Sequence, residues 1–186
     1  MRSKLFRISL VLAALLTGPG CMSYNRMVGD QEAIDQSWSE IENQLQRRND
    51  LIPNYVETVK GYAKHEREVF EKVAEARAKL AGASQVEDKM KASNELSGAL
   101  SRLLMIVEQY PQLKADQNFI RLQDELAGTE NRIAVARKRY NEAVQVYNTR
   151  IRSFPGLITA RIFGFEKRPY FEAPEEVKQV PQVKFE

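Results

Sequence analysis

The stretch IDQSWSEIENQLQRRNDLIPNYVETV, residues 34–59, determines the fold class, because its apolar residues recur at alternating steps of four and three. Continued to Leu80, this pattern puts apolar, aromatic or alanine residues at twelve of fourteen positions, the exceptions being Arg48 and Glu66. Such a repeat is typical of a helix that packs along neighbouring helices. No segment alternates in the way a half-buried strand does. We therefore predict an all-α fold.

The first helix is predicted to begin after Asp30, whose side chain suits a helix N-cap. Pro53 removes a backbone donor and crowds the carbonyl of Asn49, so it should kink or break the helix. Because the apolar phase passes Pro53 unchanged, we favour one long helix, kinked there, that ends within residues 79–84. A break at Pro53 is the alternative.

Two further long helices follow. The second is predicted over Val86–Glu108, and the third begins after Asp116 and closes near Ile151. A short helix over residues 157–163 should end at Gly164. The predicted architecture is therefore an antiparallel bundle of three long helices plus a short C-terminal helix.

The N-terminus has the layout of an export signal. Arg2, Lys4 and Arg7 precede an apolar run, residues 8–16, which is far shorter than the roughly 20 residues that span a bilayer. The run leads to Cys21, the single cysteine of the chain. We predict that Cys21 is a lipid-attachment site and that the protein is a membrane-attached lipoprotein. An uncleaved anchor is the second reading, and conventional cleavage that leaves a free thiol is the third.

These features divide the chain into four parts: a signal or anchor segment (1–20), a tether (21–29), a helical bundle domain (30–166) and a flexible, proline-containing tail (167–186). The formal net charge of +3 comes entirely from the first segment, and the remainder holds 25 basic and 25 acidic residues. A nucleic-acid surface would need a clustered basic excess, so nucleic acid is not an expected partner.

Polar residues around Pro53 are the candidate site within the body. Arg48 interrupts the apolar seam, and it could be held by an acid on a neighbouring helix or reach solvent at the bundle edge. A polar pocket near Pro53 for a small ligand is a further possibility. The candidate motif consists of Arg47, Arg48, Asp50, Pro53, Asn54, Lys60, Tyr62, His65 and Glu66.

No arrangement of catalytic residues is recognisable. His65 is the single histidine, and the sequence HEREV that begins there lacks the second histidine that a zinc-protease helix needs four residues later. No local motif supplies a serine or cysteine nucleophile with a partner base. We therefore expect neither an enzyme nor a metal or other cofactor.

Several stretches resemble the LemA family of bacterial envelope proteins. They are WSEIENQ at 38–44, QRRNDLIPNYVETVKGYAKHE at 46–66, YPQLKA at 110–115, GTENRIA at 128–134, and shorter matches at Tyr140-Asn141, Phe154-Pro155, Gly164-Phe165 and Tyr170-Phe171. The resemblance implies attachment to a membrane by the N-terminus and a helical domain outside the cytoplasm. It implies no reaction and no roles for the matched residues.

Three function classes remain. We favour a membrane-tethered interaction or scaffold protein that engages another envelope protein through its helical surface or its tail. A small-ligand sensor or carrier with a pocket near Pro53 is the alternative. An undetected hydrolase is the third class.

Overall fold

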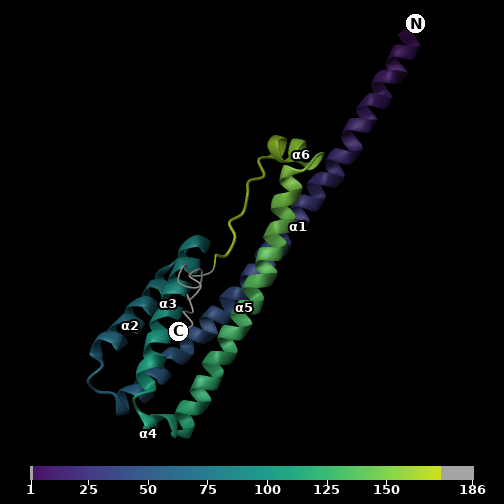
Figure 1. Cartoon of the computed structure of the whole chain (residues 1–186). Helices are drawn as coiled ribbons and strands as arrows, with labels where there is room; N and C mark the ends of the chain where they lie inside the picture. The colour runs from purple at the N-terminus through teal and green to yellow at the C-terminus, as the bar shows by residue number, and fades with distance from the viewer. Residues whose placement is uncertain (1, 173–186) are drawn as a thin grey trace, which may run out of the picture. The chain divides into compact units, whose positions relative to one another are not determined.

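The structure is a computed structural model that describes the backbone of residues 2–172 and the side chains of residues 22–172 (Figure 1). Across this described part the chain forms helices and no strands, which confirms the predicted all-α fold. The helices are α1 (Arg2–Tyr62), α2 (Arg67–Gly82), α3 (Val86–Val107), α4 (Pro111–Lys114), α5 (Gln117–Arg152) and α6 (Gly156–Phe163).

The chain divides into two compact units. Unit 1 contains Met1–Glu40 and Ala136–Tyr170, and unit 2 contains Ile41–Val135 and the chain from Phe171 onward. Helices α1 and α5 each contribute residues to both units. The four predicted domain boundaries stay predictions; residues 22–29, which were assigned to the tether, are helical as part of α1.

The core of unit 1 lies between the first part of α1 and the second part of α5. Trp38 meets Tyr140 edge to face, with ring centroids 5.7 Å apart. The Gln31 amide donates to the Tyr147 hydroxyl at 3.2 Å. Further buried apolar side chains from both helices fill the space between them: Met27, Ile34, Val144 and Ile151.

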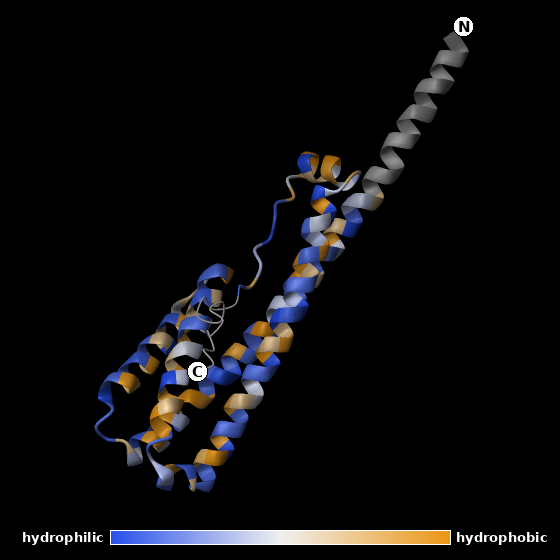
Figure 2. Ribbon diagram, viewed as in Figure 1, coloured by the Kyte–Doolittle hydropathy of each residue, from blue (hydrophilic) through white to orange (hydrophobic). Residues whose placement is uncertain are grey.

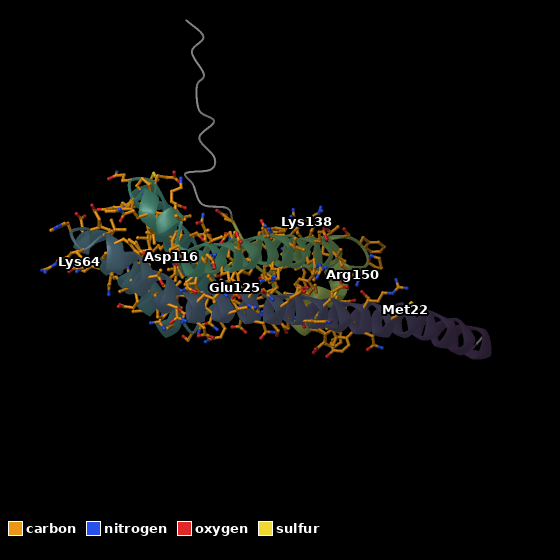
Figure 3. All side chains as sticks on the ribbon, turned by 90° about the horizontal axis from the view of Figure 1, so that it is seen from below. Met22, Lys64, Asp116, Glu125, Lys138 and Arg150 are labelled. Atoms are coloured by element: carbon orange, nitrogen blue, oxygen red, sulfur yellow. The ribbon has the colours of Figure 1, made fainter. Side chains whose placement is uncertain are left out.

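Asp30 does not cap a helix, so this prediction was wrong. α1 already runs through it, and the preceding turn supplies the acceptors that an N-cap would otherwise provide. The Asp30 carboxylate instead pairs with Arg150 of α5, whose guanidinium also donates to the Arg26 carbonyl at 3.0 Å. Figure 3 shows Arg150 near the part of α1 that contains Met22, whereas Lys138, which comes earlier in α5, lies farther from it.

An extended segment after α6 returns along α5. The Asn148 side chain accepts from the Arg168 backbone N–H at 3.0 Å and donates to the Arg168 carbonyl at 2.8 Å. The Tyr140 hydroxyl donates to the Pro169 carbonyl at 3.1 Å. The start of the predicted tail is therefore held by α5, while residues 173–186 of that tail lie outside the described residues.

Unit 2 is built on the second part of α1, around which α2, α3 and the first part of α5 pack. Its buried apolar side chains include Ile41, Leu45, Ile52, Tyr55 and Val59 of α1, Val73 and Leu80 of α2, Leu96 and Leu103 of α3, and Phe119 and Ile133 of α5. α2 and α3 lie side by side (Figure 1). The seam predicted from the sequence is therefore the buried side of α1 as far as Val59, whereas the last seam residue of the helix, Tyr62, is exposed.

The predicted helix that continues from Asp30 to Leu80 was wrong. α1 passes through Pro53 without interruption and ends at Tyr62, and α2 begins at Arg67 after a turn. α2 then runs back along α1, because Leu80 lines the same cavity as Leu45. The apolar period continues across the turn because both helices bury a stripe of the same spacing, so the period alone does not reveal the reversal.

The other predicted helix ends are close to the observed ones. The Asp116 carboxylate caps α5 by accepting from the Asn118 and Phe119 backbone N–H groups at 2.8 and 3.0 Å. Gly164 ends α6 in the left-handed conformation, with a φ of 72°. The short helix α4, which starts at Pro111, was not predicted.

Tyr55 has a buried hydroxyl with no hydrogen-bond partner, and burial raises its pKa to about 12. This folded-state pKa lies above the ordinary value of 10, so the unfolded chain loses the Tyr55 proton more readily than the folded chain. The free energy of unfolding is therefore fully retained below pH 10 and falls as the pH rises to 12. Tyr55→Phe removes this unpartnered hydroxyl, so it should raise the free energy of unfolding by about 1 kcal/mol. It should also reduce the loss of stability at alkaline pH.

Urea unfolding between neutral and alkaline pH measures both effects. Tyr147→Phe is the matched control, because its hydroxyl does accept a hydrogen bond from Gln31. That change should lower stability by about 1 kcal/mol. Equal effects of the two substitutions would contradict the expectation.

Candidate functional site

Arg48 is the centre of the candidate site. It lies on the buried stripe of α1 in unit 2, and its side chain is 1% exposed. An arginine is rarely buried to this extent without partners, because the charged head is costly to remove from water. The residues around Arg48 therefore determine whether the site can bind a ligand or stabilises the fold.

Two helices supply those partners. From α5, the Glu130 carboxylate accepts from one terminal guanidinium nitrogen of Arg48 at 2.6 Å. From α3, the Ser97 hydroxyl lies 2.9 Å from the same nitrogen, and the other nitrogen donates to the hydroxyl and carbonyl of Ser93 at 3.0 and 3.2 Å. Of the alternatives for Arg48, the structure shows the one in which an acid on a neighbouring helix holds it.

The electrostatics of the pair are unequal. Burial lowers the pKa of Arg48, and the nearby Glu130 carboxylate opposes that shift. Arginine stays charged in proteins even so, because its ordinary pKa is far above physiological pH. The Glu130 side chain is 46% exposed, so water reaches its carboxylate but not the Arg48 guanidinium. Loss of the acid would thus leave a buried charge with neutral partners alone.

The cluster is suited to joining helices. Both terminal nitrogens of Arg48 are engaged by this chain's own side chains and backbone, and the remaining Nε has no partner. A guanidinium used in this way has no pair of parallel N–H groups left to bind a carboxylate or phosphate ligand. The geometry therefore fits a contact that sets α1, α3 and α5 in one register.

A second contact explains how α1 tolerates Pro53. The proline cannot donate to the Asn49 carbonyl, four residues earlier. Arg77 of α2 fills that place, since its Nε donates to the Asn49 carbonyl at 3.2 Å. The carbonyl freed by Pro53 is thus used to attach α2.

A small cavity lies beside this contact. Its volume is about 230 Å³, and its lining residues are Glu42, Leu45, Gln46, Asn49, Leu80, Ala81, Ala83 and Lys89. Most ligand sites measure roughly 300–1,000 Å³. The Lys89 ammonium and the Glu42 carboxylate pair with each other, so the charges at this cavity are matched. Arg48, Asp50 and Pro53 do not line it, and a ligand pocket near Pro53 stays a prediction.

The other residues of the predicted motif are dispersed over the surface of unit 2. Arg47 and Asn54 are exposed, and Asp50 accepts from Gln46 within the same helix at 2.9 Å. Lys60 pairs with Glu57 at 2.7 Å, one turn away. Local pairs of this kind contribute little to stability. The structure therefore does not gather the motif around Arg48.

The end of the motif lies at the turn between α1 and α2. His65 is exposed in that turn rather than on a helix, and Glu66 stands before the first residue of α2 without capping it through its side chain. Tyr62 donates its hydroxyl proton to the Asp116 carboxylate at 3.1 Å, and this bond raises the pKa of Tyr62. Tyr62 thus connects the end of α1 to the start of α5.

Asp116 gives a testable pH effect. The Phe119 backbone N–H and then the Tyr62 hydroxyl lower the pKa of Asp116. Because the folded-state pKa lies below the ordinary value, the cap contributes fully above that value, and its contribution is lost as the pH falls through the folded pKa. Asp116→Ala should therefore lower the melting temperature at neutral pH and have a smaller effect in acid.

Thermal melts across the acid range measure this dependence. Asp116→Asn is the control, since asparagine also caps helices but does not titrate. It should keep most of the neutral-pH stability and remove the part of the acid decline that Asp116 causes. An unchanged acid decline in Asp116→Asn would contradict the assignment.

The part of the chain that the structure describes also bears on metal binding and on membrane crossing. Within it, no three or more His, Cys, Asp or Glu side chains are grouped to hold a metal ion. The helices of that same part contain no stretch long and apolar enough to cross a bilayer. The Cys21 side chain lies outside the described side chains, so lipid attachment at Cys21 stays a prediction.

The sequence prediction missed the residues that surround Arg48 and Asn49. Ser93 lies three residues before the seam residue Leu96, so it falls on the buried stripe of α3, and Ser97 follows it by one turn. A serine pair at this spacing on an apolar stripe is the signal that could have identified partners for Arg48. Glu130 and Arg77 lie at positions that carry no comparable signal.

The chain is similar in sequence to known proteins. The family model described as "LemA family" matches residues 37–185. "Magnetosome protein MamQ 2" of Paramagnetospirillum magneticum is 29% identical over 177 residues, covering 81% of this chain and 65% of that protein. "Magnetosome protein MamQ" of Magnetospirillum gryphiswaldense is 28% identical over 176 residues, with the same shares.

A further relative is "Protein LemA" of Metamycoplasma hominis, which is 28% identical over 156 residues, covering 81% of this chain and 69% of that protein. The chain spans just under two thirds of the length of the magnetosome relatives. The family model, by contrast, covers most of the chain, including α2–α6 and the polar motif around Pro53. The protein therefore belongs to the LemA family.

Proposed function

We propose that this protein is a membrane-tethered, non-enzymatic interaction module of the bacterial cell envelope, and that its helical surface binds another envelope protein. Membership in the LemA family supports membrane association. Two of the relatives are named for a cellular structure, the magnetosome, and not for a reaction. The basic and apolar N-terminal segment that ends at Cys21 supports the tether.

The observation that carries the interaction role is an exposed apolar pair at the end of α3. Leu104 and Met105 are neighbours there, and Met105 is 63% exposed. The contacts of Arg48 with Ser93 and Ser97 hold α3 from within, about two turns earlier. A surface already held in its binding geometry loses less entropy when a partner binds. Methionine is also common at adaptable binding surfaces.

Site-specific photocrosslinking in intact cells tests this role. A photoreactive amino acid replaces Leu104 in the full chain, and the expected product is one adduct of defined mass with an envelope protein. A second form adds Met105→Lys. Because Met105 is exposed, this substitution should change the free energy of unfolding by no more than about 0.5 kcal/mol. That form should lose the adduct, since a charge replaces the apolar contact.

Glu125 of α5 provides the matched control position, because it is exposed on the same unit and is polar. A photoreactive residue there should not give the adduct. Recovery of the monomer alone from Leu104, under conditions that trap known envelope neighbours, would contradict the proposal. So would an adduct that persists with Met105→Lys.

A Cys21→Ala form tests the tether in parallel. If Cys21 carries the lipid, this form should lose the mass of the acyl groups and should no longer be processed at that residue. Measurement of the intact mass after envelope extraction distinguishes a lipoprotein from an uncleaved anchor, whose mass would not change beyond the substitution.

A further inference from the structure

α6 is oriented opposite to an ordinary surface helix. It buries Gly156, Thr159 and Ala160, which are its small residues, and it exposes its large apolar residues. Ile162 is 70% exposed, and Leu157, Ile158 and Phe163 are also exposed. Figure 2 shows the hydrophobic colour on the α6 ribbon. A helix at a protein surface normally turns such side chains inward.

Packing fixes this orientation. A Cβ atom on Gly156 would lie 2.4 Å from the Arg150 carbonyl oxygen and 3.0 Å from the terminal methyl of Met27, so the backbone of α6 approaches α1 and α5 closely. At the other end, Gly164 turns the chain and the Phe165 N–H donates to the Ala160 carbonyl at 2.9 Å. The exposed apolar face is therefore built into the fold of unit 1.

Aromatic contacts place α6 beside the N-terminal part of α1. The Tyr24 ring lies 4.8 Å from the Phe163 ring and 5.6 Å from the Phe165 ring, measured between centroids. Tyr24 follows Cys21 by three residues in the same helix, a rise of about 4.5 Å. The apolar face thus lies close to the point where the predicted membrane attachment begins.

The charge of this region fits a lipid surface. Residues 152–168 contain four basic residues and one acidic residue, a net charge of +3, although the body of the chain is balanced. Arg161 lies within α6, Arg152 and Lys167 lie four residues before and after that helix in the chain, and all three are exposed. Basic residues beside exposed aliphatic and aromatic side chains are typical of helices that lie in the headgroup region of anionic membranes.

We propose that α6 is an interfacial membrane-binding helix: its exposed apolar face inserts into the headgroup and acyl boundary of the membrane that holds the N-terminus. This inference rests on the proposed tether. Helices of this kind bury their apolar face by roughly 5–10 Å. With α6 inserted, unit 1 has a second attachment point, and its orientation on the membrane is set.

Fluorescence quenching by brominated lipids tests the insertion. The full chain is reconstituted into vesicles of equal amounts of phosphatidylcholine and phosphatidylglycerol, with bromine near the headgroup end or near the terminus of the acyl chain. Ile162→Trp places the reporter on the exposed face, and Ile158→Trp repeats the measurement. The native Trp38 is buried and gives the background.

Lys138→Trp is the control, because residue 138 is exposed on the same unit about 21 Å before the end of α5. We expect the fluorescence loss of Ile162→Trp to be roughly twofold or more that of Lys138→Trp, with stronger quenching by the shallow bromines. Vesicle sedimentation of the same samples reports the tether separately.

The outcomes separate this inference from the proposed function. A chain that sediments with vesicles, but whose introduced tryptophan is quenched by aqueous acrylamide and not by bromolipid, would overturn insertion and leave the tether intact. An introduced tryptophan shielded from both quenchers would also overturn it, since protein would then cover the face. A chain that fails to sediment would overturn the tether, and the insertion with it.

Discussion

Arg48→Ala is expected to lower the free energy of unfolding by about 3–5 kcal/mol. The substitution empties a fully buried position and removes the partner of Glu130, Ser93 and Ser97 at once. Three helices lose the contact that sets their register. Urea unfolding followed by circular dichroism measures the change.

Arg47→Ala is the matched control, because it removes the same residue type from the adjacent, exposed position of α1. Its effect should stay within about 0.5 kcal/mol. If the two substitutions cost the same, Arg48 would not have the structural role that its contacts indicate.

A double-mutant cycle with Glu130→Ala measures the pair itself. Removal of Glu130 leaves Arg48 buried with neutral acceptors, whereas removal of Arg48 leaves Glu130 with access to water. We expect a coupling of about 0.5–3 kcal/mol between the two substitutions. Additive effects would show that the hydroxyl and carbonyl acceptors of α3 suffice for the guanidinium.

Gly156→Ala is expected to lower the stability of unit 1 by about 1–3 kcal/mol, because the added methyl would overlap the Arg150 carbonyl oxygen. The overlap involves backbone, which cannot rotate away as a side chain can. α6 must then move away from α1 and α5. Hydrogen exchange of the α6 amides and thermal unfolding measure the change.

Gly29→Ala is the control in the same unit, because a Cβ atom there would meet nothing within 4 Å. Gly29 lies inside α1, where alanine is the better helix former by about 0.5–1 kcal/mol. This substitution should therefore be stabilising. Equal signs for the two glycines would contradict the close packing of α6.

Local signals predicted the helix ends well where one residue controls the backbone. Asp116 caps α5 through its own side chain, and Gly164 permits the left-handed turn after α6. Asp30 carries the same signal as Asp116, yet it lies within α1 and pairs with Arg150. Capping propensity describes what a residue can do at a helix end and does not reveal whether the helix starts earlier.

Long-range contacts account for what the sequence did not reveal about the site. Arg48 was identifiable as a polar break in the seam, but Glu130 lies 82 residues away and has no marker of its own. Pro53 was recognised as an obstacle, while its solution is the donor Arg77, which comes from the next helix. The turn after Tyr62 was missed because an apolar period continues across a reversal of direction.

The hydrogen bonds of Asn148 and Tyr140 with residues 168 and 169 reach backbone atoms of the returning segment. Pro169 offers a carbonyl and needs no N–H, so its missing donor costs nothing there. Recognition of this kind depends on the direction and spacing of the chain rather than on side-chain identity. These bonds therefore depend on the side chains at positions 140 and 148 and on the backbone path of residues 168–169, and not on the side chains of those two residues.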